Sequence, residues 1–128
     1  MSIIIASVLS FVVGMLWYSP ALFGKTWAKL AGVSMSKAKQ KGMGQSMLIG
    51  FISTLVLAYV FQGLMGMLSY TGAAMGATLG FWLWLGFLAP SLIGGVLWEG
   101  KPWGLYFLNS AYWLVNLLVI GAALGRWA

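Results

Sequence analysis

The sequence contains no cysteine and no histidine, and Glu99 is the only acidic residue among its 128 residues. The missing cysteines exclude disulfides, thiolate catalysis and cysteine-ligated metal ions. The missing histidines remove the side chain that most often serves as a transition-metal ligand or general base. A single carboxylate does not supply an acid–base pair, and no nucleophile–base spacing or phosphate-binding loop is present. We therefore predict that the protein is not an enzyme and that it has no cofactor and no metal site.

Charged residues as a class are also scarce, at 6% of the chain against 62% hydrophobic residues. The mean hydropathy is +0.96. Soluble globular proteins contain about 25% charged residues, so this composition predicts an integral membrane protein. The net charge of +6 would suggest a nucleic-acid partner in a soluble protein. In a membrane protein the same charge orients the chain and attracts anionic lipid, so we expect lipid and no nucleic acid as a partner.

Four apolar segments are long enough to cross a bilayer, at about residues 3–23, 47–68, 73–98 and 103–125. These segments occupy most of the chain, so we predict a single transmembrane domain over residues 1–128. The expected fold is all-α, an integral membrane four-helix bundle. The first segment lacks the basic residues that precede the apolar core of a signal peptide, so we interpret it as a span.

A short interfacial amphipathic helix is predicted directly after the first span. Ser19 followed by Pro20 is typical of a helix N-terminus. Beyond it, apolar residues recur on one side while Lys25 and Lys29 lie on the other, which is typical of a helix on the bilayer surface. A simple solvated turn is the alternative interpretation. The segment belongs to a polar linker of about residues 24–46.

The lysines predict the orientation of the spans. Five of them lie between the first and second spans, and Lys101 lies between the third and fourth. By the positive-inside rule both connections are cytoplasmic, so both termini face outward. We expect a multi-pass protein of the inner membrane of a bacterium, with anionic lipid at its lysine-rich face.

Small residues recur at four-residue steps in several spans, which predicts close helix packing. Stripes on three spans fit a tight bundle, an oligomer or both, and we expect a homo-oligomer. Within the second stripe, we expect Gln62 to donate an interhelical hydrogen bond rather than to take part in transport. The stripes comprise Ala6, Ser10 and Gly14; Gly50, Thr54, Ala58, Gln62 and Gly66; and Gly72, Gly76 and Gly80.

The third span contains Pro90, which has no amide to bond the Gly86 carbonyl and should bend the helix. Gly94 and Gly95 loosen the turn that follows. A broken helix of this kind either lines a cavity or is a structural kink, and both interpretations stay open.

The last span carries Asn109, Tyr112 and Asn116, which share one helical face. Asparagine in a membrane helix is costly unless it is paired, so this face should look toward protein or water rather than lipid. We count these three residues among the candidate binding residues.

Glu99 lies between Trp98 and Trp103, at the end of the third span. We hypothesise that it forms a buried, coupled ion pair with Lys25, because the predicted topology places both at the cytoplasmic face. A solvated charge at a helix end is the alternative. The candidate binding residues are Glu99, Lys25, Trp17, Tyr18, Trp98, Trp103, Asn109, Tyr112 and Asn116.

Several stretches together resemble one family. WYSPALFGKTW near the start, KGMG before the second span and LWEGKPWGLYFLNSAYWLVNLLVIGAALG at the end are similar to the domain of unknown function 1761 (DUF1761) family. The likeness covers nearly the whole chain, and its most specific parts are WYSP, FGK and LWEG. The resemblance implies a small bacterial-type four-span membrane protein of unestablished activity, and it supplies no catalytic residues.

Two classes of function remain for such a bundle. In a homo-oligomeric transport or channel-like protein, symmetric copies would turn Glu99 into a ring and the Asn109 face into a polar pore lining. An accessory or scaffold subunit of a membrane complex, with lipid bound to it, needs only the packing stripes and the interfacial aromatic residues. We favour transport.

Overall fold

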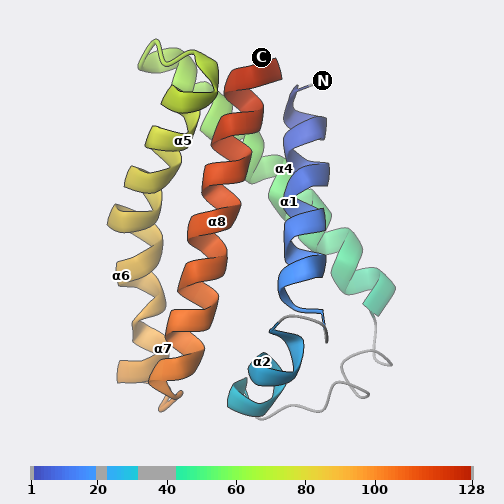
Figure 1. Ribbon diagram of the computed structural model, residues 1–128, viewed down its shortest axis with the longest axis vertical. Helices are drawn as coiled ribbons and strands as arrows, with labels where there is room; N and C mark the ends of the chain where they lie inside the picture. The colour runs from blue at the N-terminus through green and yellow to red at the C-terminus, as the bar shows by residue number, and fades with distance from the viewer. Residues whose placement is uncertain (1, 20–22, 32–42, 128) are drawn as a thin grey trace.

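The computed structural model describes residues 2–19, 23–31 and 43–127, and every regular element among them is a helix. The predicted all-α fold is therefore confirmed for this part of the chain. Lys37, Lys39 and Lys41 of the predicted linker lie outside the described residues. The elements in chain order are α1 (Ser2–Trp17), α2 (Gly24–Ala31), α4 (Met43–Met67), α5 (Gly72–Leu83), the π-helix η1 (Trp84–Leu88), α6 (Ala89–Leu92), α7 (Gly94–Leu97) and α8 (Trp103–Trp127) (Figure 1).

Three of the described helices are long and apolar enough to cross a membrane: Met47–Met67, Gly72–Leu97 and Trp103–Trp127. The α1 helix is apolar but has only 16 residues. At 1.5 Å per residue it is about 24 Å long, which is less than the roughly 30 Å of a bilayer's hydrocarbon core. The described part of the chain is thus all-helical, with three helices suited to a membrane.

The α8 helix is central to the arrangement. It packs along α5 on one side and along α1 on the other, while α2 lies near its N-terminal end (Figure 1). The α4 helix crosses behind at an angle, so it contacts α1 and meets α8 over a short length only. The two ends of the chain lie at the same end of the molecule (Figure 1).

The contact between α5 and α8 is made by glycines. Gly76 lies against the backbone of Gly121, Gly80 against that of Leu117, and Gly125 against that of Gly72. A Cβ atom at Gly76 or Gly121 would collide with the carbonyl of the other residue, so the helices approach this closely only because both positions lack a side chain. The stripe on the third span therefore packs inside one chain.

The irregular part of the third span lies around Pro90. In η1 the Ala89 amide donates to the Trp84 carbonyl, a wider turn than that of an α-helix. The helix then breaks between α6 and α7 at Ile93. The predicted disturbance at Pro90 is confirmed, and it extends over two turns because a proline and a glycine pair follow each other closely.

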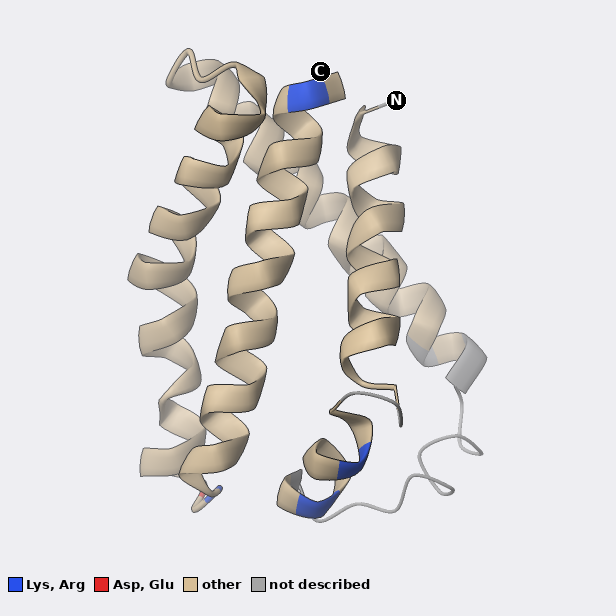
Figure 2. Cartoon of the chain, in the orientation of Figure 1, with Lys and Arg blue, Asp and Glu red and all other residues tan. Residues whose placement is uncertain are grey.

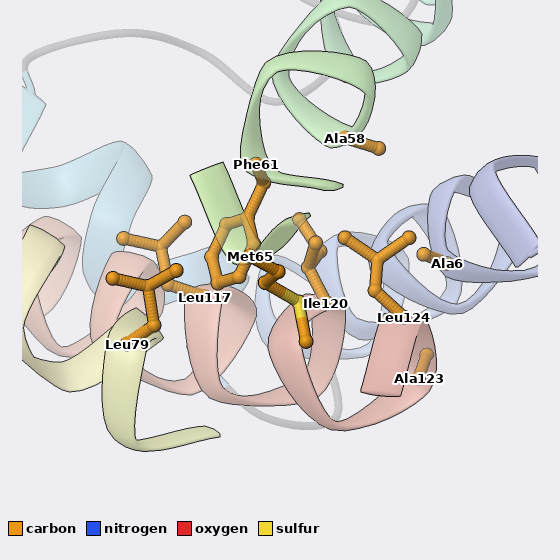
Figure 3. Packing of buried hydrophobic residues seen from close by; sticks show 9 residues of the cluster. All are labelled: Ala6, Ala58, Phe61, Met65, Leu79, Leu117, Ile120, Ala123 and Leu124. Atoms are coloured by element: carbon orange, nitrogen blue, oxygen red, sulfur yellow. The ribbon is translucent and has the colours of Figure 1, made fainter. Parts of the chain in front are cut away.

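Buried apolar residues gather where the C-terminal half of α4 crosses α8 (Figure 3). Phe61 of α4 and Ile120 and Leu124 of α8 are almost completely buried. The N-terminal half of α4 contacts α1, and the ring centroids of Phe11 and Phe51 lie 5.4 Å apart there. The apolar core is therefore concentrated toward the end that holds the termini.

Candidate functional site

Two hydrogen bonds join the polar face of α8 to α1. The Ser10 hydroxyl donates to Asn116 Oδ1 over 2.6 Å, and the Tyr18 hydroxyl donates to Asn109 Oδ1 over 2.7 Å. Between them, Tyr112 lies against Gly14, where an added Cβ would be 3.1 Å from the tyrosine oxygen. The predicted face thus looks toward protein, and its partners are Ser10 and Gly14 of α1 and Tyr18, which directly follows α1. We call these six residues the α1–α8 seam.

A tight turn holds Tyr18 in place after α1. The Phe23 amide donates to the Trp17 carbonyl over 3.0 Å, and the Gly24 amide donates to the Ser19 carbonyl over 2.8 Å. A Cβ at Gly24 would collide with the Tyr18 carbonyl, so the turn requires glycine there. Trp17 packs on Phe23, with ring centroids 4.6 Å apart. Hydrogen bonds of this turn therefore join the WYSP motif, through Trp17 and Ser19, to Phe23 and Gly24 of the FGK motif.

This turn corrects the predicted start of the second helix. The Ser19 hydroxyl donates to the Leu16 carbonyl over 2.8 Å, so it bonds the end of α1 and does not cap a new helix. The helix begins at Gly24, after the turn, and Pro20 lies outside the described residues. Its amphipathic character is confirmed, because Ala28 is buried while Lys25 and Lys29 are exposed.

Aromatic rings surround the lower end of the seam. Tyr18 lies 5.1 Å from Tyr112 and 5.7 Å from Trp27, measured between ring centroids. The indole nitrogen of Trp17 is buried without a hydrogen-bond partner in the described part of the chain. The structure therefore brings Trp17, Tyr18, Asn109 and Tyr112 together, as four of the nine candidate binding residues.

Glu99 is exposed. Among the described residues, no lysine or arginine nitrogen lies within 4.0 Å of its carboxylate, and Lys25 is exposed as well. The hypothesis of a buried Glu99–Lys25 ion pair is therefore wrong. Trp98 and Trp103, with 86% and 50% of their surfaces exposed, also do not enclose Glu99. The predicted topology concerned only the depth of these residues in the membrane, and it did not determine the lateral distance between them.

Glu99 instead lines a cavity between α6 and α7 on one side and α8 on the other. The cavity has a volume of about 280 Å³. Asn109 belongs both to this cavity and to the seam, so the polar groups of the two are adjacent. The lining residues are Ser91, Leu92, Gly95, Val96, Glu99, Lys101, Leu105, Tyr106 and Asn109.

Sequence reasoning missed Ser91 and Tyr106 as members of this site. Tyr106 precedes Asn109 by one helical turn, so the spacing alone predicts that it lies on the polar face of α8. Its hydroxyl donates to the Ala89 carbonyl over 2.9 Å. The Trp84 indole donates to the Ser110 carbonyl over 2.8 Å. These two bonds attach the irregular part of the third span to α8.

Polar contacts continue at the opposite end of α1. The Gln62 amide donates to the Ser2 hydroxyl over 2.7 Å, which confirms the predicted interhelical hydrogen bond. Ser7 is fully buried and donates to the Ile3 carbonyl of its own helix. Buried hydroxyl groups therefore occur along most of α1. Among the described residues there is no cluster of three or more potential metal ligands.

Comparison with known proteins gives one family and no further relative. A family model described as "Protein of unknown function (DUF1761)" matches residues 1–125. No curated protein and no solved structure matches the chain. Function therefore has to be argued from the geometry of the seam and the cavity.

Proposed function

We propose that the chain, which belongs to the DUF1761 family, is a membrane transport protein that moves a small polar solute. The single observation that carries this proposal is the position of Asn109. It lines the cavity that holds the only acidic side chain of the sequence, and it also belongs to the α1–α8 seam. Polar side chains within membrane helices are costly, and they commonly mark the path of a solute.

The proposal includes α1 as a fourth span. The helix lies beside α8 over most of its length and carries three buried serines that face protein (Figure 1). The turn at Tyr18 would extend it toward the membrane boundary. Lysines of α2 lie at the end of the molecule opposite Arg126 (Figure 2). By the positive-inside rule this supports a cytoplasmic α2 and outward termini, in an inner membrane with anionic lipid at the lysines.

The seam is closed in the present conformation, because Ser10 and Asn116 are each only 2% exposed. Transport therefore requires a second conformation in which these groups meet the solute. The irregular segment from Trp84 to Leu97 is the element suited to such a change, since broken helices line the solute sites of many transporters.

An osmotic swelling assay tests the proposal. Vesicles containing the purified protein are shifted into glycerol, urea, glycine or methylammonium chloride, and the swelling rate is compared with that of protein-free vesicles. We expect faster swelling for at least one solute and a loss of this excess in Glu99→Gln. Lys29→Gln is the matched control, because Lys29 is also exposed but lies outside the cavity. Equal rates with and without protein for every solute would contradict transport.

A scaffold or accessory role is the second candidate, and the exposure of α4 favours it. Tyr59 and Met67 on this helix are 70% and 82% exposed. Gly63 and Gly66 have open space where a side chain would be. We propose that this part of α4 is the surface of a homo-oligomer, because glycines allow close approach of helices in lipid. The glycine stripe of α5 is not proposed as an oligomer surface, because it packs against α8 of the same chain.

A further inference from the structure

Glu99 and Lys101 are held on one tight turn at the mouth of the cavity. Gly100 between them has a φ of +69°, which favours glycine, and the Lys101 amide donates to the Gly95 carbonyl over 3.0 Å. A Cβ at Gly95 would be 3.5 Å from Glu99 Oε2, so the carboxylate lies over this glycine. The turn therefore presents both side chains to the same space between α7 and α8.

These two opposite charges line one cavity without pairing. Their charged atoms are more than 4.0 Å apart, and no other lysine or arginine in the described ranges pairs with Glu99. A cationic ligand at Glu99 would be repelled by Lys101, and an anionic ligand at Lys101 would be repelled by Glu99. A ligand that carries both charges meets an opposite charge at each end. Such charge-assisted hydrogen bonds are stronger than those between neutral groups.

The rest of the lining limits the size of the ligand. The volume of about 280 Å³ lies just below the roughly 300 to 1,000 Å³ of pockets for drug-sized ligands. Val96 and Leu105 provide apolar contact for a short carbon chain, and Asn109 provides an amide. We infer that the cavity between α7 and α8 binds a small zwitterion, such as an amino acid, with its ammonium group at Glu99 and its carboxylate at Lys101. This inference rests on the proposed function, since it names the class of solute.

Calorimetric titration of the purified protein in mild detergent tests the inference. The probes are glycine, β-alanine and 4-aminobutyrate, which differ in the separation of their charges, with acetate and methylammonium as singly charged controls at equal ionic strength. We expect at least one zwitterion to bind about tenfold more tightly than either control, the effect of one additional charge pairing. Binding of acetate or methylammonium as tight as that of every zwitterion would overturn the inference.

Variants of Glu99 and Lys101 test whether these two side chains bind the charged ends of the ligand. Glu99→Gln and Lys101→Gln should each weaken zwitterion binding by about tenfold, whereas Lys29→Gln should leave it unchanged. The double variant Glu99→Lys with Lys101→Glu should regain binding, because it restores one charge of each sign. Unchanged affinity in both Gln variants would overturn the inference.

The failures of the two proposals are distinguishable. Zwitterion binding without solute-dependent swelling would contradict transport and leave the binding site intact. Swelling in glycerol, urea or methylammonium chloride, together with no zwitterion binding, would contradict the inference and leave transport intact.

Discussion

Ser10 of α1 and Asn116 of α8 form a buried pair, in which the serine hydroxyl donates to the asparagine Oδ1 over 2.6 Å. The pair explains how an asparagine is accommodated in the middle of an apolar helix. An unpaired amide would face lipid or protein without a partner, at a cost of several kcal/mol. The bond therefore fixes both the rotation of α8 about its axis and its register against α1.

Removing the donor should destabilise the contact between these helices. We expect Ser10→Ala to lower the free energy of unfolding by about 1 to 2 kcal/mol, because Asn116 loses its partner. The measurement is thermal or denaturant unfolding in detergent. Thr78→Val is the control, since Thr78 is exposed and bonds only the Ala74 carbonyl of its own helix. Equal losses in the two variants would mean that the interhelical bond contributes nothing specific.

Helical periodicity was sufficient to predict several features of this fold. The face of Asn109, Tyr112 and Asn116 looks toward protein, because polar side chains that face lipid without a partner are costly within a membrane. The stripe of Ala6, Ser10 and Gly14 packs, because small residues allow backbones to approach. Both features depend on one helix at a time, which is why the sequence alone reveals them.

The pairing of faces could not be predicted in the same way. All the small-residue stripes look alike in sequence, so nothing indicated that Gly76 meets Gly121 within one chain. The cavity depends on where η1 and α6 lie relative to α8, which is a tertiary property. The Glu99–Lys25 hypothesis failed for the same reason, since a shared membrane depth does not determine neighbours.

The contact between Gly76 and Gly121 should be intolerant of any side chain. We expect Gly76→Ile to reduce stability by more than about 3 kcal/mol or to abolish folding, because the added carbons meet backbone that has no room to move. Gly86→Ile is the matched control, since open space surrounds that position and it lies outside the proposed α4 interface. Folded yield and melting temperature are the measurements. A stable Gly76→Ile protein would contradict the close packing of α5 on α8.

The oligomer surface is tested at a different glycine. Gly63→Ile adds a side chain in open space, so it should leave the melting temperature of the monomer unchanged and lower the fraction of oligomer. Light scattering coupled to size-exclusion chromatography in mild detergent gives the mass. A monomeric parent protein, or a variant with the same oligomeric mass as the parent, would contradict the proposed α4 interface.

Glu99 and Lys25 should behave independently. Each is exposed and neither has an ion-pair partner in the described residues, so Glu99→Gln and Lys25→Met should each change stability by less than about 1 kcal/mol. A double-mutant cycle read by thermal unfolding measures the coupling between them. Coupling above roughly 0.5 kcal/mol would show that the two charges interact after all.

The orientation of the chain and the role of α1 can be tested with single cysteines, because the natural sequence has none. The sites are Lys29→Cys on α2, Arg126→Cys near the end of α8 and a cysteine added before Met1. If α1 crosses the membrane and the lysines are cytoplasmic, a membrane-impermeant maleimide should label the added cysteine and Arg126→Cys in intact cells. Lys29→Cys should react only after the cells are permeabilised. Labelling of Lys29→Cys from outside would contradict the proposed orientation. Labelling of Lys29→Cys and of the added cysteine from the same side would mean that α1 does not span the bilayer.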